Sequence, residues 1–213
     1  MSRIFLLRHA QSVANDKGFL AGRMKDVSLS KNGVAQKLKL NERLEGAKFD
    51  QIISSPIQRC LETIADFEPN PEIAEAFQEV NYGDWTGKRF SNLQRNRQWR
   101  EIHKHPASVR FPNGETLPEV QTRALAGLDI HIKKKSKNVL IATHGDVVRS
   151  LILHALGSHL NSIERLEIDN ASVSVIERDG NSLRVILVND KNTKMIDLMW
   201  WPTKSWTLLK VSS

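Results

Sequence analysis

Short apolar runs alternate along the chain with longer amphipathic segments, and two of the runs end at a histidine. Residues 4–7 lead into Arg8 and His9, and residues 139–142 lead into Thr143 and His144. Short apolar runs of this kind are typical of buried strands. Open α/β sheets bind their ligands beyond the carboxyl ends of the strands. The pattern therefore predicts an α/β fold in which His9 and His144 lie in one crevice.

Helices are predicted between these strands, where apolar residues recur at intervals of three and four. Ser30 is placed to cap a helix that runs to about Glu45, and Thr116 with Glu119 forms a capping box at the start of another. A third helix follows a strand at 51–54, and a fourth follows His144. The inner faces are predicted, in chain order, to be Val34, Ala35, Leu38 and Leu44; Ile57, Cys60, Leu61, Ile64 and Ala65; Val120, Ala124 and Leu128; and Val147, Val148, Leu151, Ile152 and Ala155.

The remaining segments are less regular. Residues 11–29 are predicted to be a long loop, and loops of this length in compact domains are usually functional. Residues 77–87 combine glycines and aromatics in a shaped loop. Residues at about 88–110 are polar and basic, and we expect a helical insertion that covers one side of the crevice. Segments 172–176 and 183–188 are predicted to pair antiparallel. All of these belong to one domain, residues 1–213.

Charge and cysteine content restrict the partners and the compartment. The chain has 31 Lys and Arg against 24 Asp and Glu, a formal charge of +7, but the basic residues are scattered apart from a cluster at 133–137. No nucleic-acid motif accompanies them, so we expect no nucleic-acid binding. A single cysteine, Cys60, excludes an internal disulfide and favours a cytoplasmic location. We expect no membrane association. The tail from Asn192 carries Trp200, Trp201 and Trp206 without a predicted element, and a homodimer contact there is left open.

The residues expected at the crevice fit phosphoryl transfer through histidine. The helix that follows the strand at 51–54 would start with Ser55 as N-cap and Pro56 at the first helical position. Arg59, one turn into this helix, would then lean back toward Arg8 and His9. Arginines bind and neutralise phosphoryl oxygens, a neutral imidazole can act as nucleophile, and a carboxylic acid can protonate the leaving group. Glu79, on the 77–87 loop, is the predicted acid, with Glu75 as a competitor. This chemistry needs neither a metal nor a cofactor.

These residues also resemble a known family, the histidine phosphatase or phosphoglycerate-mutase-like superfamily. The resemblance implies a three-layer α/β/α sandwich around a mainly parallel sheet. It implies that His9 is the phosphorylated nucleophile, that Arg8, Arg59 and His144 hold the phosphoryl group, and that Glu79 donates the proton. The matching positions are Leu7, Arg8, His9, Ala10, Gln11, Ser12 and Asn15; Leu29, Ser30 and Gly33; Ser54, Ser55, Pro56 and Arg59; Glu79 and the run from Tyr82 to Gly87; the run from Pro112 to Glu115; and the run from His144 to Asp146.

The resemblance further implies that Asn15, Ser12 and Arg23 line the pocket. The run from Asp84 to Gly87 and the run from His144 to Asp146 are together most similar to those of small actinobacterial proteins assigned as phosphomutases or phosphatases. Two positions depart from the family pattern. Ala10 replaces the usual glycine, and Phe90 stands where the cofactor-dependent mutases carry a lysine.

Three functions are compatible with these observations. The favoured one is a metal-independent hydrolase of a small phosphorylated metabolite that works through a phosphohistidine. The second is a phosphoglycerate-mutase-like phosphomutase, which Phe90 disfavours although Lys88 and Arg89 are close neighbours. The third is a non-catalytic protein that binds phosphorylated ligands or RNA, supported only by Ala10 and the positive charge. His103, His105, His131, His154 and His159 are expected to be structural or exposed, and no metal site is predicted.

Overall fold

The computed structural model describes residues 1–199, and its centre is a six-stranded sheet in the order β3-β2-β4-β1-β5-β6. The strands are β1 (Ser2–Arg8), β2 (Gln51–Ser54), β3 (Glu72–Ile73), β4 (Asn138–Thr143), β5 (Val173–Asp179) and β6 (Ser182–Asp190). The first four in the order, β3, β2, β4 and β1, pair in parallel, whereas β5 and β6 are antiparallel. The mainly parallel sheet and the antiparallel hairpin are confirmed.

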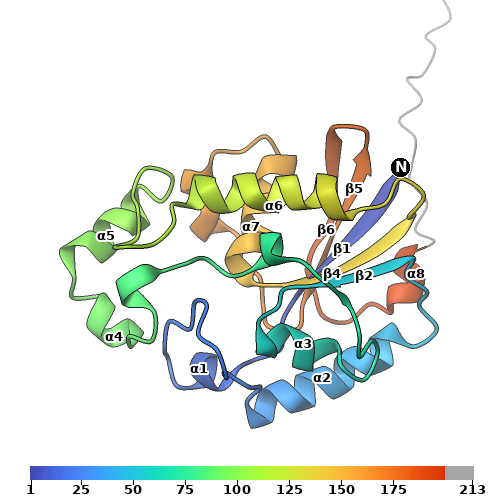
Figure 1. The fold of residues 1–213 in the computed structure, drawn as a ribbon, viewed down its shortest axis with the longest axis horizontal. Coiled ribbons are helices and arrows are strands. Elements are labelled where there is room, and N and C mark those ends of the chain that lie inside the picture. The colour runs from blue at the N-terminus through green and yellow to red at the C-terminus, as the bar shows by residue number, and fades with distance from the viewer. Residues whose placement is uncertain (200–213) are drawn as a thin grey trace, which may run out of the picture.

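Helices cover both faces of this sheet. The α-helices are α1 (Val13–Asp16), α2 (Lys31–Leu44), α3 (Gln58–Ile64), α4 (Phe90–Leu93), α5 (Arg97–Lys104), α6 (Leu117–His131), α7 (Gly145–Ala155) and α8 (Met195–Met199). Three 3-10 turns, η1 (Glu75–Phe77), η2 (Gly83–Trp85) and η3 (Leu160–Arg165), lie in the connections. α6 and α7 pack on one face, and α2, α3 and α8 pack on the other (Figure 1). The predicted α/β sandwich is confirmed.

The two faces of β1 show why a continuous apolar run is needed there. Ile4 and Leu6 point into the core beneath α6 and α7, whereas Phe5 and Leu7 point into the core above α2 and α3. Successive side chains of a strand point to opposite faces, so a strand buried on both sides carries no polar positions. All four side chains are fully buried.

The predicted inner face of α2 is wrong in part. Val34 and Leu38 are 49% and 58% exposed, and Ala35 is exposed as well, whereas Leu44, as predicted, and Leu40 are buried. The helix is rotated because Arg43 lies on its buried side, where the guanidinium pairs with Asp190 at 2.7 Å. A buried charged group that is paired in this way is invisible to a pattern that counts only apolar residues.

The predicted start of α3 is also wrong. The helix begins at Gln58, and Ile57 occupies the cap position without a side-chain hydrogen bond. The Ser55 hydroxyl instead accepts a 3.3 Å hydrogen bond from the Ile57 amide and contacts the His144 ring. A serine that local sequence predicts to be a helix cap thus contacts His144, a residue far away in the sequence, with its hydroxyl.

The segment at 88–110 contains α4 and α5, which project beside α1 at one end of the molecule (Figure 1). The tail tryptophans Trp200, Trp201 and Trp206 lie outside the described residues. Among residues 1–199, no helix combines the length and the apolar character needed to cross a bilayer.

Gly33 fixes the approach of α2 to the chain that follows His9. A Cβ at this position would lie 1.9 Å from the backbone oxygen of Gln11. We therefore expect Gly33→Ala to lower the free energy of unfolding by about 1–3 kcal/mol, the usual cost of overpacking. Urea denaturation measures it, with Val34→Ala at the next, exposed position as the control. Equal stability of the two variants would contradict the close approach.

Candidate active site

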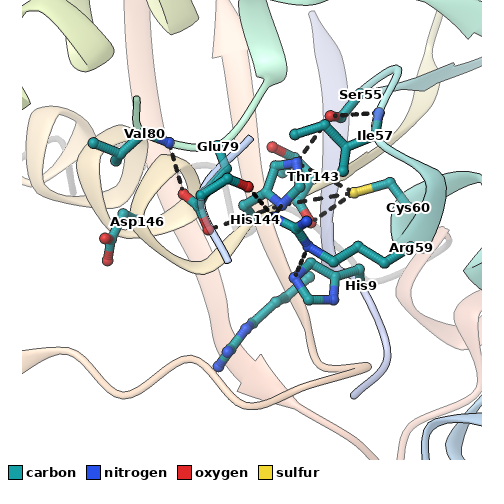
Figure 2. Close-up of polar contacts among 12 residues, drawn as sticks. His9, Ser55, Ile57, Arg59, Cys60, Glu79, Val80, Thr143, His144 and Asp146 are labelled. Carbon is teal, nitrogen blue, oxygen red and sulfur yellow. Dashed lines mark hydrogen bonds and ion pairs between the residues drawn. The ribbon is translucent and has the colours of Figure 1, made fainter. Parts of the chain in front are cut away.

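His9 follows the last residue of β1 and is 2% exposed. Its Nδ1 lies 2.7 Å from the Ala10 carbonyl oxygen. Its Nε2 accepts a 3.1 Å hydrogen bond from Nε of Arg59 (Figure 2). A carbonyl cannot donate and a guanidinium cannot accept, so the proton resides on Nδ1. Burial lowers the pKa of His9 well below its usual value, and the charges of Arg59 and Arg8 lower it further. His9 is therefore a neutral imidazole with its lone pair on Nε2.

Arg59 joins the two histidines. It comes from the second residue of α3 and is 1% exposed. Its Nη2 donates to the backbone oxygen of Gly22 at 2.8 Å and lies 3.1 Å from Nδ1 of His144. The His9 and His144 rings are in edge contact, with centroids 5.2 Å apart. One guanidinium thus fixes the orientation of both rings.

His144 is the N-cap residue of α7 and is fully buried. Because Nδ1 accepts from Arg59, the ring proton lies on Nε2, which is 2.8 Å from the Ser55 hydroxyl. Sγ of Cys60 lies 3.4 Å from the same nitrogen (Figure 2). Burial and the charge of Arg59 lower the pKa of His144 well below its usual value, so this ring is also neutral.

Two buried guanidinium nitrogens in the site, Nε of Arg8 and Nη1 of Arg59, have no hydrogen-bond partner among the described residues. Arg8 is held by Ile168, whose carbonyl accepts from Nη1. A Cβ at position 145 would lie 3.3 Å from Nε of Arg8, so Gly145 keeps side-chain atoms away from this nitrogen. Buried donors are rarely left unsatisfied, and charged ones favour anions. The pair forms a ready site for an oxyanion.

Glu79 supplies a carboxyl group whose proton is retained near neutral pH. Its pKa is raised to about 7, first by burial and then by the neighbouring Asp146, while Arg59 and Arg8 act in the opposite direction. One carboxyl oxygen accepts from the Val80 amide at 3.0 Å, and the other is 3.8 Å from Nδ1 of His144. Such a group can give and take a proton at the pH of a cell. Its competitor Glu75 is exposed.

A network that the sequence did not predict holds the Glu79 loop. Arg23 and Arg123 donate to the backbone oxygen of Glu79 at 2.9 and 3.1 Å. Both also pair with the Glu115 carboxylate, at 2.8 and 2.9 Å. Arg23 was expected to line the pocket, but it is not among the lining residues, because its guanidinium is used to tie the loop to Glu115. In the sequence, the signal for this network was the run from Pro112 to Glu115, because it ends in the carboxylate that both arginines contact.

Ser12 and Asn15 form a local capping box at the start of α1. The backbone amide of Asn15 donates to Oγ of Ser12 at 3.2 Å, and the side-chain oxygen of Asn15 accepts from the backbone amide of Ser12 at 3.1 Å. Asn15 lines the cavity, as expected, but Ser12 does not, because its hydroxyl is used for the cap. Ala10 is fully buried, and its amide donates to Oγ1 of Thr63 at 2.9 Å rather than toward the cavity. Its Cβ is therefore accommodated without loss of a phosphate-facing amide.

A cavity of about 250 Å³ opens beside these groups. Arg8, His9, Arg59 and Glu79 all line it, whereas the fully buried His144 lies behind them. The cavity is also lined by three residues to which the sequence assigned no role, Tyr82, Asp146 and Arg149. The Tyr82 hydroxyl donates to the Asp146 carboxylate at 2.6 Å, and Arg149 pairs with the same carboxylate at 2.8 Å. Across residues 1–199, no cluster of three His, Cys, Asp or Glu side chains has the arrangement of a metal site.

The nearby charge of Asp146 gives a test of this electrostatic arrangement. Asp146→Asn removes a negative charge that raises the pKa of Glu79, so we expect that pKa to fall below about 7. Carboxyl-detected NMR titration of Glu79 measures it directly. Asp84→Asn, an exposed change in the same loop, is the control and should leave the titration unchanged. A Glu79 pKa unaffected by Asp146→Asn would contradict the coupling.

Comparisons with known proteins agree with this geometry. Residues 4–191 match the model of the histidine phosphatase superfamily, branch 1. Phosphoserine phosphatase 1 of Hydrogenobacter thermophilus is 28% identical over 89% of this chain and 92% of its own length. A phosphoglycerate mutase of Schizosaccharomyces pombe is 30% identical over 88% and 96%. The solved structure of Bacillus stearothermophilus YhfR has a TM-score of 0.80 and 26% identity over 89% and 98%. As the sequence predicted, this chain is an enzyme that belongs to the histidine phosphatase superfamily.

Proposed function

We propose that the chain is a metal-independent phosphomonoester hydrolase that acts on a small phosphorylated metabolite through a phosphohistidine on His9. The observation that carries this proposal is the pair of unpartnered guanidinium nitrogens of Arg8 and Arg59 beside a neutral imidazole. Phosphoryl oxygens would satisfy both donors at once. A relative named phosphoserine phosphatase supports the same reaction class.

In the first step, Nε2 of His9 attacks phosphorus while the bond to the ester oxygen breaks. The hydrogen bond from Nδ1 to the Ala10 carbonyl keeps the lone pair on Nε2. Before substrate binds, Nε of Arg59 donates a 3.1 Å hydrogen bond to Nε2 of His9. As substrate binds, Nε donates to a phosphoryl oxygen instead, which frees the lone pair of His9 for attack. Glu79 gives its proton to the leaving alkoxide, so the products of the step are an alcohol, phosphohistidine and a carboxylate.

In the second step, water attacks phosphorus and the bond to Nε2 of His9 breaks. The Glu79 carboxylate takes a proton from that water, which returns the acid to its initial state. The two arginines stabilise the charge on the transferring group. His144 contributes by accepting from Nη2 of Arg59 at 3.1 Å, which orients that guanidinium. Inorganic phosphate leaves and His9 is neutral again. Two buried guanidinium groups supply the positive charge for which other phosphatases use a metal.

A phosphomutase on the same scaffold is the second candidate, favoured by the relative named phosphoglycerate mutase at 30% identity. In that reaction the phosphohistidine passes its phosphoryl group to another hydroxyl instead of to water. Incubation with 3-phosphoglycerate and a bisphosphoglycerate primer tests it. We expect phosphate release without 2-phosphoglycerate, and accumulation of 2-phosphoglycerate would instead establish the mutase.

Several further expectations belong with this proposal. We infer a single domain over residues 1–213 in which the helices of the 88–110 segment cover the site, as Phe90, Trp99 and His103 line the cavity. The kinship to actinobacterial phosphomutases or phosphatases, the cytoplasmic location and the absence of nucleic-acid binding are proposed from the sequence, and the homodimer is left open.

The His9 mechanism predicts how turnover responds to mutation and to chelation. With 4-nitrophenyl phosphate, we expect His9→Ala to lower phosphate release by at least roughly a thousandfold. Among residues 1–199, His9 is the imidazole that both lines the cavity and is hydrogen-bonded to Arg59. EDTA should leave the wild-type rate unchanged. His154→Ala removes an exposed histidine of α7 and serves as the control. Full activity of His9→Ala would refute the nucleophile, and a wild type with neither turnover nor phosphohistidine would indicate the non-catalytic binding protein.

A further inference from the structure

The cavity beyond the phosphoryl site has an apolar lining. Besides Arg8, His9, Arg59 and Glu79, the residues that line it are mostly aromatic and aliphatic. They come from the loop at 11–29, from the chain between Phe90 and the start of α6, and from η3. They are Phe19, Leu20, Phe90, Trp99, Ile102, Pro106, Phe111, Leu117 and Ile163. Polar substrates such as phosphorylated hydroxy acids would find few partners on such a surface, whereas apolar groups would be removed from water.

Trp99 is the centre of this apolar wall. Its ring lies 5.4 Å from that of Trp85, 6.1 Å from that of Phe90 and 4.5 Å from that of His103, measured between centroids. Trp85 behind it is 2% exposed, whereas Trp99 is half-buried and lines the cavity. Packing from behind holds Trp99 in place with part of its ring available to a ligand.

The remaining charged groups of the lining are already paired with each other. Arg149 pairs with Asp146 at 2.8 Å and also donates to the Leu166 carbonyl at 2.8 Å. His103 pairs with Glu164. These two pairs leave no net positive charge for a second anionic group of a substrate. Outside the phosphoryl site, the described lining is therefore suited to a neutral, apolar group.

On these observations we propose, resting on the phosphatase function above, that the preferred substrates are phosphate monoesters of an aryl or arylalkyl alcohol that carries no second anionic group. A cavity of about 150 Å³ is enough to hold benzene. The 250 Å³ here accommodate a phenyl ring together with its phosphoryl group. Arg8 and Arg59 bind the phosphoryl end, and Trp99 and Phe19 contact the ring.

Binding of two non-hydrolysable phosphonates tests the ligand class without turnover. Calorimetry on the wild-type protein compares 3-phenylpropylphosphonate with 4-phosphonobutyrate, which replaces the ring by a carboxylate. We expect the phenyl compound to bind at least about tenfold more tightly, as burial of part of a ring implies. Equal or tighter binding of the carboxylate compound would overturn the proposal.

Variants of the apolar wall test which residues make the choice. Trp99→Ala should reduce the affinity ratio of the two phosphonates to about twofold or less, and Phe19→Ala, from a different element, should reduce it independently. Circular dichroism confirms the fold of each. Ile130→Ala, which removes a side chain that is 75% exposed on α6, is the control and should keep the ratio. A ratio unchanged in both wall variants would contradict the assignment.

Hydrolysis separates this proposal from the phosphatase function. The kcat/KM values for 2-phenylethyl phosphate and 3-phosphoglycerate compare esters of two unactivated alcohols. We expect at least about a tenfold preference for the phenyl ester. A preference for 3-phosphoglycerate would overturn the substrate class while hydrolysis stands. Failure to hydrolyse either ester, with the phosphonate preference intact, would overturn the phosphatase and leave the ligand class supported.

Discussion

The buried guanidinium of Arg59 is the interaction on which the rest of the site depends. It has donors and no acceptor, so each histidine nitrogen that it contacts must carry a lone pair. That single constraint places the proton of His9 on Nδ1, toward the Ala10 carbonyl, and the proton of His144 on Nε2, toward the hydroxyl of Ser55. Burial, and after it the same charge, lowers the pKa of both rings well below the usual value, so both are neutral at ordinary pH. Its remaining nitrogen, Nη1, has no hydrogen-bond partner among residues 1–199 and is the natural partner of an oxyanion.

The sheet makes this arrangement possible. β1 and β4 are adjacent and parallel, with Arg8 opposite Thr143, and the His9 amide donates to the Thr143 carbonyl at 3.0 Å. Parallel strands end at the same edge, so two histidines far apart in the sequence meet without any long-range sequence signal. Glu79 is placed differently, by a loop whose backbone oxygen is held by Arg23 and Arg123. The proposed acid is therefore fixed by contacts with two arginines, and the proposed nucleophile by the sheet.

The sequence was sufficient to predict β1 and β4 and the residues at their ends, because a strand buried on both sides leaves a continuous apolar run. It was insufficient where tertiary contacts override local pattern. Val34 and Leu38 are exposed because Arg43 takes the buried side of α2 by pairing with Asp190. The loss of the predicted cap at Ser55 has the same origin, since its hydroxyl contacts His144. The role of Arg123 could not be predicted at all, because nothing in a helical pattern shows which carbonyl a surface arginine will reach.

A covalent phosphoryl group on His9 is the central claim, and rapid quenching into base measures it most directly. Enzyme mixed with excess aryl phosphate and quenched within one turnover would be digested, and the phosphorylated peptide located by mass spectrometry. The structure predicts phosphorylation of His9 at Nε2, formed at least as fast as product is released. Turnover without a phosphoryl group on His9, or one that forms more slowly than turnover, would contradict the account.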